Sequence, residues 1–344
     1  MNFASDNWSA ATPEVMAAIE RHNTGLAPAY GGDAVTAAME QRFAEIFETA
    51  VEVWCVGSGT AANALSMAAA ARPGGLILCS ENAHLYHDEL GAAEFFTGGM
   101  KLVPVPARRG LMSPEALAAT LARFPAGNRT GQPSILSLTE ASELGTVYRP
   151  EELRSLADLA HASGMVVHMD GARFANAVAA LGATPAALSW QAGIDIMSFG
   201  ATKNGCWAAD AILVFAPDRC GDLGTLRQRA GHTASKSRFM AAQFEGYLED
   251  GNWLRRAAHA NAMAQQLATG IAASDSARLA WKPQANEVFA VLPAATVTRL
   301  RETGAVFHEW PAEGIELASD ERLIRLVTSW ATVGEEVERL ARLL

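Results

Sequence analysis

Short apolar runs alternate with helical patterns along most of the chain, and this alternation constrains the fold more than any other feature. Seven of the runs have the length and the β-branched content of buried strands. They are VEVWCV from Val51, LILC from Leu76, KLVPV from Lys101, ILSLT from Ile135, MVVHMD from Met165, IDIMSF from Ile194 and AILVF from Ala211. Strands that alternate with helices predict an α/β fold, with a mainly parallel seven-stranded sheet and helices on both of its faces.

The pattern changes near Gly246. The stretch NWLRRAAHANAMAQQLATGI predicts one long helix, and the strand candidates EVFAVL, AVFHEW and LIRLVTSW and a terminal helix follow it. This order is typical of a separate small α+β domain. We therefore expect a large domain over residues 1–246 and a small C-terminal domain over residues 247–344.

The net charge and the cysteines limit the classes of binding partner and the cellular compartment that we expect for this chain. The formal net charge of -10 argues against a nucleic acid or an anionic membrane surface as partner. Cys55, Cys79, Cys206 and Cys220 show neither a CxxC pair nor a zinc spacing, which predicts free thiols and no metal site. The N-terminus lacks the pattern of a signal peptide, and no apolar stretch reaches membrane-spanning length. These features predict a cytoplasmic protein.

A glycine-containing turn after the first strand is the first candidate site. In VGSGTAANAL the strand ends at Val56, Gly57 and Gly59 open a tight turn, and an alanine-rich helix begins at Thr60. The start of a helix favours an anion, so we expect Ser58, Gly59 and Thr60 to bind a phosphate group. Taken alone, the turn also fits an ordinary strand-to-helix connection. It matches neither G-x-G-x-x-G nor a Walker loop, which disfavours dinucleotides and nucleoside triphosphates.

Two charged residues follow strands further along the chain. Asp170 ends the strand VVHMD and so lies at the carboxyl edge of the sheet, where it can meet a cationic ligand atom or cap the next helix. Lys203, in SFGATKNG, follows the strand that ends at Phe199 and is either a nucleophilic amine or a solvated loop residue. The order of phosphate turn, acid and lysine is more informative than any one of them.

This order resembles the fold-type I pyridoxal-phosphate enzymes, and the details resemble the low-specificity L-threonine aldolases, which group with the β-eliminating lyases. The resemblance extends over nearly the whole chain. It is carried by FASDNWS, AYGGD, GSGTAAN, SENAHLYHDELGAAEFF, ELGTVYRPEEL, HMDGARFANAVAALG, FGATKNG, ASKSRFMAAQ, LEDGNWLR and LIRLVTSW. It implies pyridoxal 5'-phosphate as cofactor and retro-aldol cleavage of L-threonine, L-allo-threonine and other β-hydroxy-α-amino acids to glycine and an aldehyde. It also implies a homodimer or homotetramer with shared active sites.

The resemblance assigns cofactor-binding roles to five side chains. Lys203 would form the Schiff base, and Asp170 would pair with the pyridine nitrogen. Thr202 would contact the phosphate and His84 would stack on the ring. Lys236 would reach the phosphate in the neighbouring subunit of the oligomer, and Arg229 is close enough in sequence to compete for this role.

Four residues are implied to bind the substrate. Ser5, Arg173 and Arg325 would hold its α-carboxylate, with Arg173 also close to the cofactor, and Tyr30 would contact the substrate as well. The local sequence supports the same role for Arg325, because strand alternation in LIRLVTS places this residue between apolar neighbours on one face. A buried guanidinium in that position requires an anion, whereas on an exposed strand face it would be solvated.

The sequence leaves more than one candidate for the group that removes the proton of the substrate's β-hydroxyl. By resemblance it is His84, with or without Asp88, and both would share a face if residues 84–90 were helical. Many aldolases carry a second histidine in a THNG segment, where this chain reads SELG with Glu143 in the place of that histidine.

Four alternative functions fit parts of the pattern. A β-eliminating lyase or an amino-acid racemase would use the same Lys203, Asp170 and Arg325. A non-catalytic regulator on the same scaffold would usually carry a DNA-binding module, and no basic helical domain precedes residue 50. A nicotinamide dehydrogenase is disfavoured by the glycine pattern and would leave Lys203 unexplained.

Overall fold

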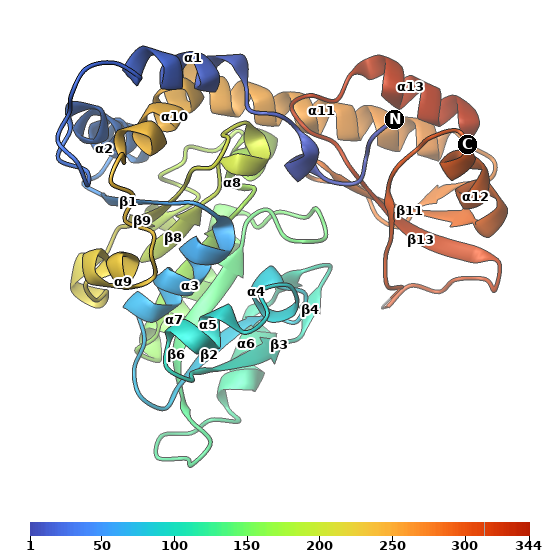
Figure 1. The fold of residues 1–344 in the computed structure, drawn as a ribbon. Coiled ribbons are helices and arrows are strands. Elements are labelled where there is room, and N and C mark those ends of the chain that lie inside the picture. The colour runs from blue at the N-terminus through green and yellow to red at the C-terminus, as the bar shows by residue number, and fades with distance from the viewer. Residues whose placement is uncertain (313) are drawn as a thin grey trace.

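The computed structural model describes residues 1–312 and 314–344 and contains a large sheet with strand order β1-β9-β8-β7-β6-β2-β3 (Figure 1). The strands are β1 (Glu52–Val56), β2 (Gly75–Ser80), β3 (Lys101–Val105), β6 (Gln132–Thr139), β7 (Val166–Gly171), β8 (Ile196–Phe199) and β9 (Asp210–Val214). Each of the seven predicted apolar runs forms one of these strands. A short hairpin lies outside this sheet and consists of two strands of two residues each, β4 (Ala107–Arg108) and β5 (Leu111–Met112).

The sheet is mainly parallel, as predicted. Strand β9 pairs antiparallel with both β1 and β8, and the other neighbouring pairs are parallel. Parallel pairing brings the carboxyl ends of β6, β7 and β8 to one edge, where Asp170 lies between Thr139 and Ser198 in register. The acid at the end of β7 therefore faces the space beyond this edge.

Helices cover both faces of the sheet. They are α1 (Pro13–His22), α2 (Ala34–Phe47), α3 (Gly59–Ala69), α4 (His84–His87), α5 (Ala92–Phe96), α6 (Pro114–Leu121), α7 (Pro150–Ala162), α8 (Phe174–Leu181), α9 (Leu223–Arg229) and α10 (Arg238–Leu248). On one face Phe43 of α2 packs edge-on against Phe199 of β8, with ring centroids 5.2 Å apart. On the other face Leu65 of α3 packs with Ile196 and Ile212. The predicted two-sided covering is confirmed.

Local signals in the sequence explain where these helices begin. Helix α6 starts at Pro114, and the side chain of Ser113 accepts a hydrogen bond from Ala116 in its first turn. Helix α7 starts at Pro150, and Glu152 closes a capping box by accepting from the Arg149 N–H. Short 3-10 turns complete the large domain and its junction: η1 (Asp6–Trp8), η2 (Trp190–Ala192), η3 (Thr202–Asn204), η4 (Pro217–Arg219) and η5 (Glu249–Gly251).

The C-terminal part forms a second, four-stranded antiparallel sheet with order β10-β11-β13-β12. Its elements are α11 (Asn252–Ala272), β10 (Arg278–Leu279), β11 (Glu287–Pro293), α12 (Ala294–Glu302), β12 (His308–Glu309), β13 (Glu321–Val327) and α13 (Gly334–Leu343). The three predicted strands and the two predicted helices are present. Helix α11 runs from the large domain to the small one (Figure 1). The division expected after residue 246 falls in the last turn of α10 and stays a prediction.

The N-terminal segment is tied to the small sheet before it enters the large domain. The Phe3 N–H donates to the Val306 carbonyl and the Val327 N–H donates to the Phe3 carbonyl, both at 2.8 Å. The Phe3 side chain is fully buried in the small-domain core. Residues 1–3, expected with the large domain, therefore pack with the small one. Within the described ranges, no helix is long and apolar enough to cross a membrane.

Candidate active site

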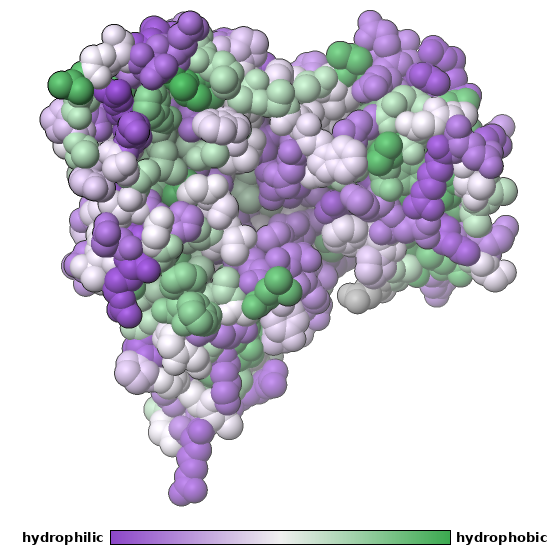
Figure 2. Space-filling view, viewed as in Figure 1, coloured by the Kyte–Doolittle hydropathy of each residue, from purple (hydrophilic) through white to green (hydrophobic). Residues whose placement is uncertain are grey.

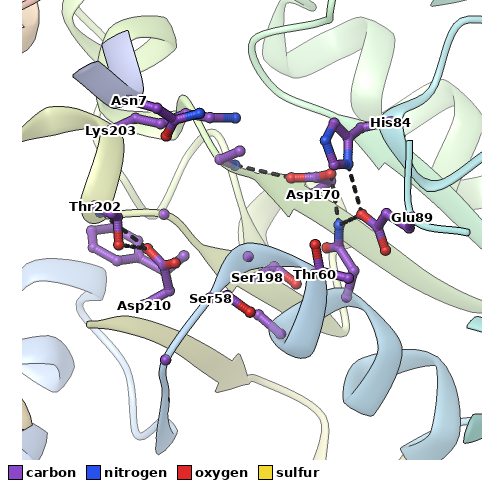
Figure 3. A pocket seen from close by; sticks show the side chains of 17 residues that line it. Asn7, Ser58, Thr60, His84, Glu89, Asp170, Ser198, Thr202, Lys203 and Asp210 are labelled. Atoms are coloured by element: carbon purple, nitrogen blue, oxygen red, sulfur yellow. Dashed lines mark hydrogen bonds and ion pairs between the residues drawn. The ribbon is translucent and has the colours of Figure 1, made fainter. Parts of the chain in front are cut away.

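A cavity of about 250 Å³ lies at the carboxyl edge of the large sheet, and we call it the sheet-edge cavity. It is lined by residues from η1, the turn before α3, the ends of β7 and β8, and η3 (Figure 3). Of the residues predicted from the sequence, it brings together Ser58, Gly59, Thr60, His84, Asp170, Thr202 and Lys203. Figure 2 shows a hollow between the two domains with hydrophilic side chains along it.

The turn before α3 forms the anion-binding end of the cavity. The Ser58 hydroxyl accepts from the Ala61 N–H at 3.2 Å and caps the helix. We find no hydrogen-bond partner for the N–H groups of Gly59 and Thr60 in the described part of the chain. These amides belong to the first turn of an 11-residue helix, where the helix dipole is positive. The turn therefore offers two free donors to an anion.

Asp170 supplies a buried carboxylate to the cavity. One of its oxygens, Oδ2, accepts from the side-chain amide of Asn63 at 2.9 Å, and Oδ1 accepts from the Ala172 N–H at 3.0 Å. These bonds fix the orientation of the carboxylate and compensate for its burial. Asn63 lies on α3, and its role was not predicted from the sequence.

Lys203 lies in η3 with its side chain half-buried along the cavity beside Asn7 (Figure 3). Its ammonium makes no ion pair or hydrogen bond with any residue that the structure describes. The turn that carries it is held by Asp210, whose Oδ1 accepts from the N–H groups of Ala201 and Thr202 and from the Thr202 hydroxyl, at 2.8 to 3.1 Å. The lysine is therefore placed firmly while its amine stays available.

His84 is paired with Glu89, a residue that the sequence did not single out. The His84 Nδ1 lies 2.9 Å from Glu89 Oε1, which also accepts from Asn63 at 2.8 Å. The hydrogen bond to Glu89 raises the pKa of His84, and burial raises the pKa of Glu89. The pair therefore keeps a proton to a higher pH than its isolated members.

Asp88 does not share the position of His84. Helix α4 ends at His87 after one turn, so the helical stretch 84–90 on which the shared face depended is absent and Asp88 becomes the C-cap. Asp88 lines a separate cavity of about 280 Å³, together with Glu143 and Trp310, and we call it the tryptophan cavity. Glu89, one residue further on, reaches His84 because the chain turns there.

Arg173 and Arg325 converge on a buried carboxylate next to the sheet-edge cavity, but they do not line it. Arg173 donates from Nε and Nη2 to the two oxygens of Asp6, at 2.8 and 3.1 Å. The Glu287 Oε1 lies 3.4 Å from Arg173 Nη2 and 3.7 Å from Arg325 Nη1. The Arg325 guanidinium stacks over Trp310 at 4.3 Å. The two predicted carboxylate-binding arginines therefore lie together.

The three remaining predicted residues lie outside the lining of the sheet-edge cavity. The Ser5 hydroxyl caps η1 by accepting from the Asn7 N–H at 3.1 Å. Tyr30 and Lys236 are exposed and lie close together, because the Tyr30 N–H donates to the Ser235 carbonyl at 3.1 Å. Neither of these two reaches the cavity of its own chain.

The residues around the sheet-edge cavity fit pyridoxal 5'-phosphate. The unpartnered amides of Gly59 and Thr60 suit its phosphate, and the buried carboxylate of Asp170 suits its protonated pyridine nitrogen. The free amine of Lys203 suits its aldehyde carbon. This set of groups, at this edge of this sheet, defines a fold-type I pyridoxal-phosphate-dependent enzyme.

Comparison with known proteins identifies the family to which the chain belongs. The beta-eliminating lyase family matches residues 2–295, and the chain belongs to this family. The chain is 41% identical over 340 residues to the low specificity L-threonine aldolase of Pseudomonas aeruginosa, a match that covers 99% of this chain and 96% of that protein. The enzyme of the same name from another Pseudomonas is 39% identical, covering 98% and 95%. The solved structure of Leishmania major threonine aldolase superposes with a TM-score of 0.92 at 25% identity, covering 99% and 97%.

Proposed function

We propose that the protein cleaves L-threonine, L-allo-threonine and other β-hydroxy-α-amino acids to glycine and an aldehyde. The observation that carries this proposal is the convergence of Lys203, Asp170 and His84 on one cavity, in a chain 41% identical to a low specificity L-threonine aldolase. When bound, pyridoxal phosphate supplies an electron sink for the cleavage of a bond to Cα. The protein's own residues decide which bond is cleaved and where the protons go.

The cofactor would be held by three groups of this chain. Ser58 and the amides of Gly59 and Thr60 would bind the phosphate, Asp170 the pyridine nitrogen and Lys203 the aldehyde carbon. The hydroxyl of Thr202 donates to Asp210, so its contact with the phosphate would require a change of partner.

The substrate's α-carboxylate would be bound by Arg325 with the help of Arg173 and Ser5. Two donors of Arg173 are already used by Asp6, whereas the buried Nε of Arg325 has no hydrogen-bond partner among the described residues. Arg325 is therefore the better candidate for a bidentate contact. Fixing the carboxylate orients the substrate about Cα and so selects the bond that breaks.

His84 would accept the proton of the β-hydroxyl. Its Nδ1 is engaged by Glu89, which leaves Nε2 as the nitrogen that can face a substrate. Neutral His84 is the active form in this role, because only a neutral imidazole accepts a proton. Asp88 lies in the tryptophan cavity, which supports His84 with Glu89 over His84 with Asp88.

The test is to incubate the holoenzyme with L-threonine, L-allo-threonine, D-threonine and L-phenylserine and to measure glycine and aldehyde. We expect both products from the L-substrates, and loss of at least about a thousandfold in rate for Lys203→Ala. An oxo acid with ammonia would indicate a β-eliminating lyase, and inversion at Cα would indicate a racemase. Absence of glycine from all four substrates would refute the aldolase assignment.

We further infer a cytoplasmic homodimer or homotetramer with shared active sites. Tyr30 and Lys236 lie side by side on the surface, away from the sheet-edge cavity of their own chain. Tyr30 is 64% exposed and Leu26, in the same loop, is fully exposed, as expected for a contact with another subunit. All four cysteines are free, which supports a reducing compartment.

A further inference from the structure

Glu287, the first residue of β11, is a buried carboxylate without a hydrogen bond. Its side chain is completely buried, and neither Oε1 nor Oε2 has a hydrogen-bond partner in the part of the chain that the structure describes. The nearest cationic atoms are the Arg173 Nη2 at 3.4 Å and the Arg325 Nη1 at 3.7 Å. A buried carboxylate is normally satisfied by hydrogen bonds, so this one calls for an explanation.

The charges around Glu287 do not balance when every group is ionised. The groups that face it are Arg173 after β7, Arg325 on β13, Asp6 in η1 and Glu143 in the loop after β6. Asp6 is bound bidentately by Arg173, and Glu143 lies 4.0 Å from the same guanidinium. Three carboxylates thus surround two guanidiniums, and the carboxylate of a substrate would be a fourth.

Burial raises the pKa of Glu287 to about 7, with Glu143 and Asp6 acting in the same direction and the two arginines acting against it. Arg173 and Asp6 remain charged, because their bidentate contact raises the pKa of Arg173 and lowers that of Asp6 against the effect of burial. Glu287 therefore takes a proton near neutrality more readily than Asp6 does.

Arg325 is placed to receive a second anion. Its guanidinium stacks on Trp310, and its buried Nε is unpartnered among the described residues. An anion bound there would stand close to the carboxylate of Glu287 and would be repelled by it. Protonation of Glu287 removes that repulsion and makes its hydroxyl a hydrogen-bond donor.

We propose that Glu287 positions Arg173 and Arg325 for the substrate's α-carboxylate and takes up one proton from solvent when that carboxylate binds. The only bond formed is the O–H bond of Glu287, and a buffer acid loses the proton. The inference rests on the proposed function for the identity of the anion. It makes Glu287 a positioning residue whose protonation sets the pH range of substrate binding.

The first test compares KM and kcat for L-threonine from pH 6 to pH 8 in the wild type and in Glu287→Gln. Ionisation of the substrate amine affects the KM of both enzymes equally, so its effect cancels in the ratio of the two KM values. With a pKa of about 7, we expect the ratio of wild-type KM to variant KM to rise about tenfold between pH 6 and pH 8. The ratio of the kcat values should stay constant. A KM ratio that does not change with pH would show a purely structural role.

Glu321→Gln is the matched control. Glu321 lies at the other end of the small sheet, where it pairs with Arg278 at 2.8 Å, and it does not contact the arginine cluster. Its KM ratio should stay near one at every pH. A tenfold change in this control as well would attribute the effect to the small domain as a whole and overturn the assignment to Glu287.

The second test needs neither a mutation nor turnover. Calorimetric titration of the wild-type holoenzyme with 3-hydroxybutyrate, an amine-free analogue of threonine, is carried out in two buffers of different ionisation enthalpy. From a pKa of about 7 we expect uptake of about 0.9 proton per site at pH 8 and about 0.1 at pH 6. Binding without proton uptake at pH 8, or no binding at any pH, overturns the inference.

The proposed function and the proposed role of Glu287 can be refuted independently of each other. Absence of glycine and aldehyde from every substrate refutes the proposed function, while the calorimetric result still reports on a carboxylate bound between the arginines. Normal turnover with no proton uptake refutes the role of Glu287 alone.

Discussion

At the scale of single residues, a continuous set of hydrogen bonds runs along one side of the sheet-edge cavity. Asn63 donates to both Asp170 and Glu89, and Glu89 in turn holds His84. Asp170, the proposed partner of the cofactor's nitrogen, and Glu89, which holds the proposed base His84, thus share one amide.

Glu89→Gln tests the role of His84. Because the Glu89 carboxylate raises the pKa of His84, the variant should lower that pKa and move the acidic limb of kcat/KM to lower pH. The measurement is a pH profile of glycine release from L-threonine. Asp88→Asn is the comparison: if it moves the limb and Glu89→Gln does not, Asp88 is the group that acts with the histidine.

The sequence predicted site residues best where a strand end places them. Lys203, Asp170 and the turn at Ser58 to Thr60 follow apolar strands directly, and all of them line the cavity. Asp88 and Glu89 could not be ranked in this way, because their positions depend on where a one-turn helix ends. Asn63 could not be found either, since an amide in an alanine-rich helix resembles any other polar position until its neighbours are known.

At the scale of elements, β7 and β8 approach each other so closely at their carboxyl ends that only glycine fits. A Cβ on Gly200 would lie 2.5 Å from the Ala172 carbonyl oxygen and 2.6 Å from the Ala172 Cα. Both contacts are with backbone, which cannot turn away as a side chain can. The gap is fixed by the strand that carries Asp170 and the strand that leads to Lys203.

Gly200→Ala should therefore cost about 2 to 3 kcal/mol of stability and weaken cofactor binding by separating the two strand ends. Urea unfolding and a cofactor titration measure the two effects. Gly334→Ala is the control, since the nearest atom to its added Cβ is 3.9 Å away and belongs to a side chain. We expect that change to alter stability by no more than about 0.5 kcal/mol. Equal stability of both variants would contradict the packing argument.

Strand β7 also carries a buried histidine that gives the sheet a dependence on pH. His168 lies between Ser137 on β6 and Ser198 on β8, at 2.9 and 3.1 Å. Burial lowers its pKa to about 4, and the nearby charge of Asp170 acts in the opposite direction. The folded protein therefore binds a proton here less readily than the unfolded chain does.

From this difference we predict that His168 makes the wild type lose about 2 kcal/mol of stability between pH 7 and pH 5. The free energy of unfolding falls with pH because the lowered pKa of His168 contributes stability above pH 6.5, and this contribution is lost as the pH falls toward 4. His168→Gln should lose correspondingly less over that interval when urea unfolding is measured at both pH values. His308→Gln, on an exposed strand, should behave as the wild type does; equal pH dependence in all three proteins would refute the prediction.

Elements were predicted from the sequence in proportion to their length and apolar content. All seven strands of the large sheet and the 21-residue helix α11 were expected, because each has a long, regular apolar pattern. Strand β10 was missed because its two residues are too few to show alternation. Its pairing with β11 depends on the tertiary fold.

At the scale of the whole molecule, the site draws on every part of the chain. The N-terminal turn η1 supplies Asp6 and Asn7, the large domain supplies the proposed cofactor-binding residues, and the small sheet supplies Glu287 and Arg325. Because Arg325 lies on the small sheet whereas Arg173 and Lys203 lie in the large domain, a change in the angle between the domains would alter the distance between Arg325 and Lys203. If Arg325 holds the substrate's carboxylate as proposed, substrate binding and domain position are coupled.

The proposed sharing of sites between subunits has a clear test. Lys203→Ala and Lys236→Ala subunits, each expected to retain less than about a tenth of the activity alone, are co-expressed with different tags and the mixed oligomer is purified. If Lys236 serves the neighbouring subunit, one of the two sites in each mixed dimer is intact, and activity should recover to about half that of the wild type. Activity no higher than the average of the two parents would place Lys236 at the site of its own chain.

The burial of Phe3 in the small-domain core has a consequence for the order of events on the ribosome. Phe3 is synthesised long before its partner on β13, Val327, which lies more than 300 positions later. The large domain can begin to fold during translation, whereas the small domain cannot complete its core until β13 has been made. Phe3 remains unpaired until then, so a substitution such as Phe3→Ala should slow the last step of folding and leave the earlier folding of the large domain unchanged.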